Sequence, residues 1–485
     1  MIGAYAIEQD YSHYVSRQSS IIIGVVGTAT KGDVNTPTLC TSTADFIRKF
    51  GPASADHIGM YAGLYYLNQG RQLYFCRAEG GTAAAKATVT IPGVNSSTPV
   101  ASARVLTALT PGTFYNNLKV TVATSVIGYK ITISEVDTGR TVETILYQIG
   151  DTFRSSYFEL TVSATVTGLT TGNYTATGGT DSATGLTATH WNTATDEFSS
   201  ELYDINLLAI PGISLNAVVT NALELASTRG DCLYLVDPPN NLDPDDVKDW
   251  HNAAGEYTSN TLLNNSYGAL YWSWQKVYDN DSSSYIDLPP SAVVAAVMAK
   301  SARETEIWMP PAGLVRGLIQ GVAEPVYSPD AGERDALYAD QNAVNCIIND
   351  PTYGLVVFGQ KTLLRTQTAL NRVNVRMLLN YLKRVVVAAA KYLTFEPNDS
   401  TTWNAFEDLV EPTLRSIGQR RGLYAYKIVT GESIVTDDDI DNYRMPCKIL
   451  IQPTRAAEEI PIYFTITSTG VDFNEVLESD SAIES

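Results

Sequence analysis

The sequence is poor in histidine and cysteine and lacks long apolar runs, and each of these shortages excludes a class of protein. Of its 485 residues only four are histidine and five are cysteine, and no two cysteines form a CxxC pair. Zinc sites and dithiol redox sites need such clusters, so neither is expected. His13, His57 and His190 are isolated, so no metal is expected there. The longest apolar runs, such as Val385–Ala390, fall far short of the roughly 20 residues that a membrane span needs. We therefore expect no cofactor and no membrane insertion.

Positive charge is also scarce, since 33 Lys and Arg stand against 52 Asp and Glu, a formal net charge of −19. With a pI near 4.6, most of the surface would repel phosphate, which argues against direct nucleic-acid binding. The first residues lack a basic region followed by an apolar run. We therefore expect no secretion signal, and we expect the protein to be made in the cytoplasm.

The cysteines are far apart in the sequence and are predicted to be free, buried thiols. Their odd number leaves room for a disulfide bond between subunits, formed after release into oxidising surroundings. Cys40 and Cys447 are the candidates for that bond.

One stretch departs from the acidic background, because Tyr353–Phe395 carries seven bases and no acid. Within Arg372–Leu393 the apolar residues recur three and four apart, which predicts an amphipathic helix. At about 100° per residue, five bases fall within an arc of roughly 120° on another face. They are Arg372, Arg376, Lys383, Arg384 and Lys391. This basic stripe is either a solvated face or a docking face, and an acidic protein surface is the partner that fits.

The chain is long enough for two or three domains. Its first twenty residues, with Tyr5 and Ile7 on one side, carry too little apolar surface for a core and predict an extended arm. Ile21–Gly27 reads as a buried strand. The following Gly27-x4-Gly32 is not a phosphate-binding loop, because Asp33–Val34 stands where Lys and Ser or Thr are required.

Helices are next predicted at Thr43–Gly51 and Asp56–Asn68, and a strand at Leu73–Arg77. From about Thr82 to Ser200 the composition turns to alternating Thr, Ser, Gly and Val. This pattern predicts a β-sandwich or β-barrel inserted into the main domain. Its later part, Thr167–Thr189, is dense in Thr and Gly and is predicted to be a mobile loop.

From Leu202 onward strands and helices alternate, which predicts a largely parallel sheet. The expected strands are Leu207–Pro211, Cys232–Pro239 and Ala269–Trp274, and the expected helices Leu215–Ser227, Asp243–His251 and Pro290–Ala302. A helix at Trp403–Gln419 and a strand at Lys448–Gln452 follow the basic helix. In a last strand, Ile462, Phe464 and Ile466 face one way. The tail from Asp472 holds five acids and no base and cannot fold alone.

Eleven segments, none of them decisive alone, follow one another in a recognisable order. They are Ile23–Gly32, Ala44–Gly51, Leu67–Arg77, Leu235–Pro239, Gly268–Trp274, Leu288–Ser291, Trp308–Gly313, Arg372–Leu382, Phe395–Asp399, Ile451–Thr454 and Tyr463–Phe473. Together they resemble the contractile tail sheath proteins of bacteriophages, a family that includes phage-derived contractile particles. The resemblance covers both ends and the α/β part but not the β insertion.

The resemblance implies a subtilisin-like α/β domain, a β-sandwich or barrel insertion on the outer surface, and an α+β C-terminal domain near an inner tube. It also implies arms at both ends that add strands to neighbouring subunits, with Tyr5, Ile7, Ile462, Phe464 and Ile466 in the arm strands. The expected parts are an arm at 1–20, the first part of the core at 21–81, the insertion at 82–200, the α/β domain at 201–350, the C-terminal domain at 351–465, and an arm with an acidic tail at 466–485.

The implied function is that of a structural subunit in a virion tail, made in the host cytoplasm and not an enzyme. It would polymerise as a helical sheath around the tail tube and contract to drive the tube through the host envelope for genome delivery. The partners would be other copies, the tail tube protein, and the baseplate and tail terminator proteins. The basic stripe would hold an acidic tube surface. A sheath of a phage-derived injection or secretion apparatus is the alternative.

A hydrolase is the rival from another class, because Asp237, His251 and Ser291 stand in the order of a subtilisin triad. A nucleophile also needs an oxyanion pocket, and Pro289–Pro290 replaces the small residues that let a substrate approach. An active enzyme is therefore not expected.

Overall fold

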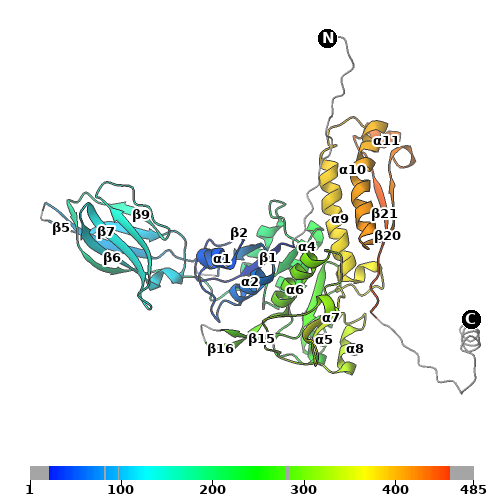
Figure 1. Ribbon diagram of the computed structural model, residues 1–485, viewed down its shortest axis with the longest axis horizontal. Helices are drawn as coiled ribbons and strands as arrows, with labels where there is room; N and C mark the ends of the chain where they lie inside the picture. Colours follow the sequence, from blue (N-terminus) through cyan, green and yellow to red (C-terminus); the bar gives the residue numbers. More distant parts are fainter. Residues whose placement is uncertain (1–20, 81–82, 97, 280–282, 459–485) are drawn as a thin grey trace, which may run out of the picture. The chain divides into compact units, whose positions relative to one another are not determined.

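The computed structural model describes residues 21–80, 83–96, 98–279 and 283–458 (Figure 1). Described residues up to Thr454 belong to one compact unit. The predicted arm residues Tyr5, Ile7, Ile462, Phe464 and Ile466 lie outside the described residues.

An eight-stranded sheet organises this unit, in the order β19-β18-β14-β13-β12-β1-β3-β2. All neighbours from β18 to β3 are parallel, and β19 and β2 pair antiparallel at the two edges. The bounds are β1 Ile23–Gly27, β2 Thr38–Cys40, β3 Leu73–Arg77, β12 Leu207–Ala209, β13 Leu233–Val236, β14 Gly268–Trp272, β18 Val344–Asp350 and β19 Gly354–Phe358. The mixed α/β arrangement predicted from the sequence is confirmed.

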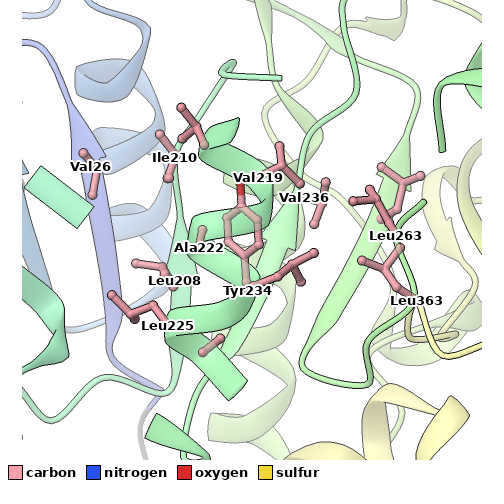
Figure 2. Close-up of a cluster of buried hydrophobic side chains, with 14 of the residues drawn as sticks. Val26, Leu208, Ile210, Val219, Ala222, Leu225, Tyr234, Val236, Leu263 and Leu363 are labelled. Atoms are coloured by element: carbon pink, nitrogen blue, oxygen red, sulfur yellow. The ribbon is translucent and has the colours of Figure 1, made fainter. Parts of the chain in front are cut away.

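Helices cover both faces of the sheet, which explains why its central strands are continuous hydrophobic runs. One face packs against α1 (Thr43–Phe50), α2 (Ile58–Gln69) and α6 (Pro290–Glu304). The other packs against α3 (Ala188–Asp196), α4 (Asn216–Arg229), α5 (Pro244–Asn252) and α8 (Ala331–Tyr338). Figure 2 shows part of this second cluster, with Tyr234 of β13 beside Val219 and Ala222 of α4.

The helix boundaries follow from capping residues. Ser42 accepts a hydrogen bond from the Asp45 backbone N–H at the start of α1, and Gly51 ends that helix at φ 91°. Asp243 caps α5 by accepting from the backbone N–H groups of Asp245 and Asp246, with Pro244 at the first helical position. These signals are readable in the sequence, so α1 and α5 are found where they were predicted.

The β insertion is a sandwich of two four-stranded antiparallel sheets, β10-β4-β5-β9 and β11-β6-β7-β8, around a shared hydrophobic core. The bounds are β4 Thr88–Asn95, β5 Thr98–Ala108, β6 Leu118–Ser125, β7 Gly128–Glu135, β8 Thr141–Tyr147, β9 Phe158–Ser163, β10 Gly168–Leu169 and β11 Gly172–Thr175, with a 3-10 turn at Thr113–Asn117. The loop predicted at Thr167–Thr189 is wrong in part, because β10 pairs with β4 and β11 pairs with β6.

The insertion also ends earlier than the predicted Ser200. Trp191 and Ala194 of α3, and Phe198 of the 3-10 turn Glu197–Ser199, are buried in the core of the eight-stranded sheet. These apolar residues follow a polar stretch whose composition resembles the insertion, so composition alone misplaces the boundary.

Buried cations hold the base of the insertion. Arg77 of β3 is 0% exposed and donates to the carbonyl oxygens of Gly32, Pro111 and Asp181. The Lys31 ammonium lies 3.9 Å from the ring centroid of Phe114. Where the chain leaves and rejoins the core, the Gly80 backbone N–H donates to the Ser182 carbonyl at 3.0 Å.

The C-terminal part of the unit is a helical hairpin packed on a two-stranded sheet. Its elements are α9 Val373–Lys391, α10 Ser400–Gln419, β20 Leu423–Val429, β21 Lys448–Pro453, a 3-10 turn at Gly431–Ser433 and the short α11 Asp437–Asp441. The predicted boundary at 351 falls inside the β18–β19 hairpin of the large sheet, so the C-terminal part begins later than predicted.

The remaining elements are β15 Gln275–Asp279, β16 Ser284–Leu288, β17 Glu324–Pro325, α7 Gly313–Arg316 and the 3-10 turns Gly255–Tyr257 and Ala369–Asn371. Strands β16, β15 and β17 form a small three-stranded sheet. Within the described ranges, no helix combines the length and apolar character that a membrane crossing requires.

Leu235 tests the central strand β13, where it is 1% exposed. Replacing Leu235 with Ala should lower the free energy of unfolding by about 2–5 kcal/mol, because it removes buried methyl groups and leaves a cavity. Leu202, which is 84% exposed, is the matched control, and Leu202→Ala should change stability by less than about 0.5 kcal/mol. Denaturant titration measures both, and equal effects would contradict the assigned core.

Candidate functional site

The basic stripe of α9 faces other parts of its own chain. The opposite, apolar side of α9 packs with α10 through residues such as Leu378, Leu382 and Val385. The basic side lies against the segment 200–231 and against Ser266 and Tyr267. We call these contacts the α9 joint.

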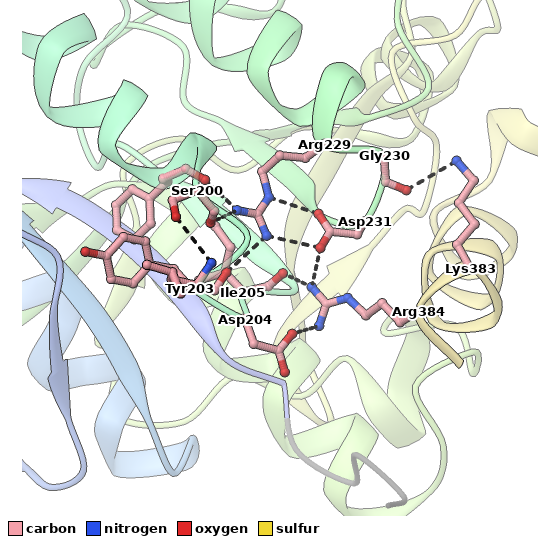
Figure 3. Close-up of polar contacts among 11 residues, drawn as sticks. Ser200, Tyr203, Asp204, Ile205, Arg229, Gly230, Asp231, Lys383 and Arg384 are labelled. Carbon is pink, nitrogen blue, oxygen red and sulfur yellow. Dashed lines mark hydrogen bonds and ion pairs between the residues drawn. The ribbon is translucent and has the colours of Figure 1, made fainter. Parts of the chain in front are cut away.

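Arg384 is bound most extensively within the joint (Figure 3). Its guanidinium donates to the Asp204 carboxylate and the Ile205 carbonyl, and lies 3.4 Å from Oδ2 of Asp231. Asp231 also accepts two bonds from Arg229, at 2.9 Å from Nε and 3.0 Å from Nη2. Arg229 in turn donates to the carbonyl oxygens of Ser200 and Tyr203. One carboxylate therefore joins two guanidinium groups and connects α9 to the segment leading into the large sheet.

Tyr267 organises the second half of the joint. Lys383 donates to the Tyr267 hydroxyl at 2.6 Å and to the Gly230 carbonyl at 3.2 Å. The Arg376 guanidinium lies 4.1 Å from the Tyr267 ring centroid and donates to Ser266 Oγ at 2.6 Å. Arg376 is 3% exposed, and this burial lowers the pKa of its guanidinium. A guanidinium over an aromatic face is stabilised by the ring quadrupole.

The other two bases contribute less to the joint. Arg372 precedes the first turn of α9 and donates to Asn371 Oδ1 at 2.9 Å. The side chain of Lys391 is 70% exposed and lies 3.9 Å from Glu201. Arg376 is buried and therefore does not belong to an exposed stripe. Lys383 is exposed and Arg384 is partly exposed, but internal partners already bind both charged groups. A tube contact through these residues stays a prediction.

The two candidate intersubunit thiols differ in burial. Cys40 is 0% exposed, and burial raises the pKa of its thiol to about 12, so it is poorly suited to disulfide exchange. Burial therefore disfavours Cys40, and a disulfide bond between subunits stays a prediction. Cys447 is half-buried, and burial also raises the pKa of its thiol.

The residues in triad order do not form a triad. Ser291 donates from Oγ to Asp237 Oδ2 at 2.6 Å and from its backbone N–H to Oδ1 at 2.7 Å, without an intervening imidazole. Both ring nitrogens of His251 are buried and have no hydrogen-bond partner among the described residues, and burial lowers the pKa of His251 to about 3. Ser291 is 0% exposed. The Ser291–Asp237 pair instead ties the start of α6 to the end of β13.

Arg229, Asp231 and Tyr267 were not predicted as members of the joint. A readable signal was present, because Arg229 ends α4 and Asp231 follows one residue after the helix-ending Gly230. Their partner Arg384 lies 153 residues away from Asp231.

Asp231 is the most informative position in the joint. Asp231→Asn should lower the free energy of unfolding by about 1–3 kcal/mol, because two largely buried guanidinium groups lose their shared counter-charge. Glu201→Gln is the matched control, since Glu201 is 94% exposed in its contact with Lys391, and it should cost less than about 0.5 kcal/mol. Denaturant titration measures both, and an Asp231→Asn protein as stable as the control would argue against the joint.

Asp237 should make stability depend on pH. Burial raises its pKa from 3.8 to about 6, against the opposing hydrogen bonds from Ser291 and Gly212. The folded chain therefore binds this proton more tightly than the unfolded chain does. Its stabilising effect is complete below about pH 4 and is lost as the pH rises through about 6. In Asp237→Asn the decline in unfolding free energy between these values should be smaller than in the parent. Identical pH profiles from denaturant titrations would refute this.

Two family matches cover most of the α/β and C-terminal parts. Residues 184–363 match the family described as phage tail sheath protein central domain, and residues 366–469 match the phage tail sheath C-terminal domain. The tail sheath protein of Enterobacteria phage T4 is 30% identical over 63% of this chain and 48% of its own length. The tail sheath protein of Vibrio phage KVP40 is 28% identical over 67% of this chain and 52% of its own length. The chain thus spans about half the length of these curated relatives.

Solved structures share the fold at low identity. The sheath tail protein of Listeria innocua has a TM-score of 0.64 at 14% identity, over 90% of this chain and 92% of that one. The PVC sheath complex of an extracellular contractile injection system, in the contracted state, has a TM-score of 0.59 at 17% identity. This match covers 98% of this chain and 99% of that one. With the family matches on both the central and the C-terminal parts, the chain belongs to the phage tail sheath protein family.

Proposed function

We propose that this chain is the structural subunit of a contractile tail sheath, which polymerises helically around an inner tube. The observation that carries the proposal is the β20–β21 sheet. It has two strands, and among the described residues neither outer edge has a further strand paired to it. A two-stranded sheet is marginal by itself, and an unpaired edge is a template for a strand from another chain.

The terminal arms are the strands that we propose for these edges. Tyr5 and Ile7 at one end of the sequence, and Ile462, Phe464 and Ile466 at the other, would add to the β20–β21 sheet of neighbouring copies. Strand addition forms backbone hydrogen bonds that persist while subunits rotate. A polymer linked in this way can shorten without coming apart.

The large sheet is proposed to be a subtilisin-like framework without the enzyme's activity. Its mostly parallel strands and the order Asp237, His251, Ser291 support that relationship. The direct Ser291–Asp237 hydrogen bond supports a structural role for the pair, since the hydroxyl proton is held by the carboxylate instead of a histidine.

For the inner tube we propose the exposed end of α9 as a contact, with Lys391 toward an acidic tube surface. Its side chain is 70% exposed, whereas Arg376 is 3% exposed. Exposed ion pairs contribute about 0–1 kcal/mol each, which suits a contact that must release on contraction. The baseplate and tail terminator proteins are the further partners proposed, and the virion tail is the location.

In the proposed mechanism, assembly on the tube and baseplate traps an extended lattice of higher free energy. A trigger at the baseplate then releases a wave of subunit rotation that drives the tube through the host envelope and delivers the genome. The sheath of a phage-derived injection particle is the second candidate, supported by the likeness to the PVC sheath complex. Its mechanism would be the same.

Removal of residues 459–485 tests the proposal. The truncated chain should keep the unfolding free energy of the parent, because the compact unit ends at Thr454, but should form no sedimenting polymers or tubes in electron micrographs. Removal of the exposed loop 148–152, which follows β8 in the insertion, is the control for an unrelated deletion and should leave polymerisation intact. Tubes that form and shorten normally without residues 459–485 would overturn the proposal.

A further inference from the structure

The β20–β21 hairpin has one face on the hydrophobic core and an opposite, outward face that is basic. Cross-strand partners share one face of a sheet, so the strand register shows which face each residue lies on. Tyr426 pairs with Ile451 and Ile428 pairs with Ile449, and these four pack on the core of α9 and α10. Lys427 pairs with Leu450 and Lys448 pairs with Val429, which places both lysines on the opposite, outward face.

Among the described residues, the bases on this face have no counter-charge. Neither strand contains an acid, and no ion pair joins Lys427, Lys448 or the nearby Arg421 to another described residue. Neighbouring arginines differ, since Arg415 pairs with Glu411 at 2.6 Å and Arg420 pairs with Glu306. Exposed apolar groups accompany the bases, with Tyr424 71% exposed and Leu450 48% exposed. An acidic segment with some apolar side chains would complement this surface.

The end of the sequence has this composition. From Asp472 to Ser485 it holds five acids and no base, interspersed with Phe473, Val476, Leu477 and Ile483. Nothing in the proposed strand addition uses these acids. We propose that the acidic tail 472–485 of one copy binds the outward face of the β20–β21 hairpin of a second copy. This inference rests on the proposed function and names the partner of the same sheet.

The proposed arm strand would bring the tail to this face. Asp472 follows Ile466 by six residues, a reach of about 20 Å when extended. A copy that adds Ile462–Ile466 to a neighbour's sheet edge therefore releases its acids within reach of Lys427 and Lys448. Such tethering raises the effective concentration of the tail at the face. Exposed pairs of this kind are individually weak and screened by salt, so the contact should strengthen the polymer at low ionic strength.

Charge reversal on each side tests the inference with the full chain. One variant reverses the face, Lys427→Glu with Lys448→Glu, and one reverses the tail, Glu475→Lys with Glu478→Lys. Each alone should lower the sedimented polymer fraction severalfold at about 50 mM salt, and the differences should shrink at about 500 mM. The control, Lys130→Glu with Arg154→Glu, places the same charge change on exposed residues of the insertion and should polymerise as the parent does.

Mixing the two variants shows whether the tail binds the hairpin of another copy or that of its own chain. Between two copies, the acidic tail of the face variant meets a basic face, and the basic tail of the tail variant meets an acidic face, so the mixture should recover parental polymer. Recovery only when all four substitutions are in one chain would mean that the tail binds its own hairpin, and would overturn the inference. So would variants that polymerise like the parent at low salt. A parent chain that forms no polymer at any salt would instead refute the proposed function itself.

The tail variant is the control for a loss of polymer that is caused by misfolding. Its substitutions lie beyond the compact unit that ends at Thr454, so its free energy of unfolding should equal the parental value. If only the face variant lost polymer while the tail variant kept it, the loss would reflect damage to the hairpin, and the inference would fail.

Discussion

The carboxylate of Asp231, shared by Arg229 and Arg384, is the contact on which the arrangement of this chain depends. It joins the end of α4, the segment 200–205 and the middle of α9 at one point. Without the charge of Asp231, Arg229 would lose its carboxylate partner and Arg384 would keep that of Asp204 alone. Because Val373 and Met377 of α9 also pack in the core of the large sheet, polar and apolar contacts fix the helix together. The C-terminal part of the unit, with α9, α10, β20 and β21, should therefore move with the eight-stranded sheet as one body.

Much of the fold was predictable because its signals are local. Hydrophobic runs gave β1, β3, β12, β13 and β14, and caps such as Ser42 and Asp243 gave the helix starts. Strand β20 was missed, since Tyr424, Ala425 and Lys427 lie exposed and the strand is defined by its partner β21. The boundary at Ser200 was misplaced because α3 sits in a polar stretch yet buries Trp191 in the sheet core.

The joint was predictable only in part, and for a physical reason. Helical periodicity identifies which bases share a face, and it did so for Arg376, Lys383 and Arg384. It cannot identify what that face touches, because Asp204, Asp231 and Tyr267 come close only after folding. The same limit applied to Asp237 and Ser291, whose order suggested a triad but whose direct hydrogen bond serves packing.

The close approach of Gly80 and Ser182 makes the sandwich a detachable module. Its two connections to the core come together where the Gly80 backbone N–H donates to the Ser182 carbonyl at 3.0 Å and to Ser182 Oγ at 2.9 Å, so one short link could close the chain without it. Strand β3 precedes the insertion and β12 follows it, and both pair with β1, so they would keep their register. The insertion could thus be exchanged or lost in evolution while the large sheet stayed unchanged, and laboratory fusions could use the same junction.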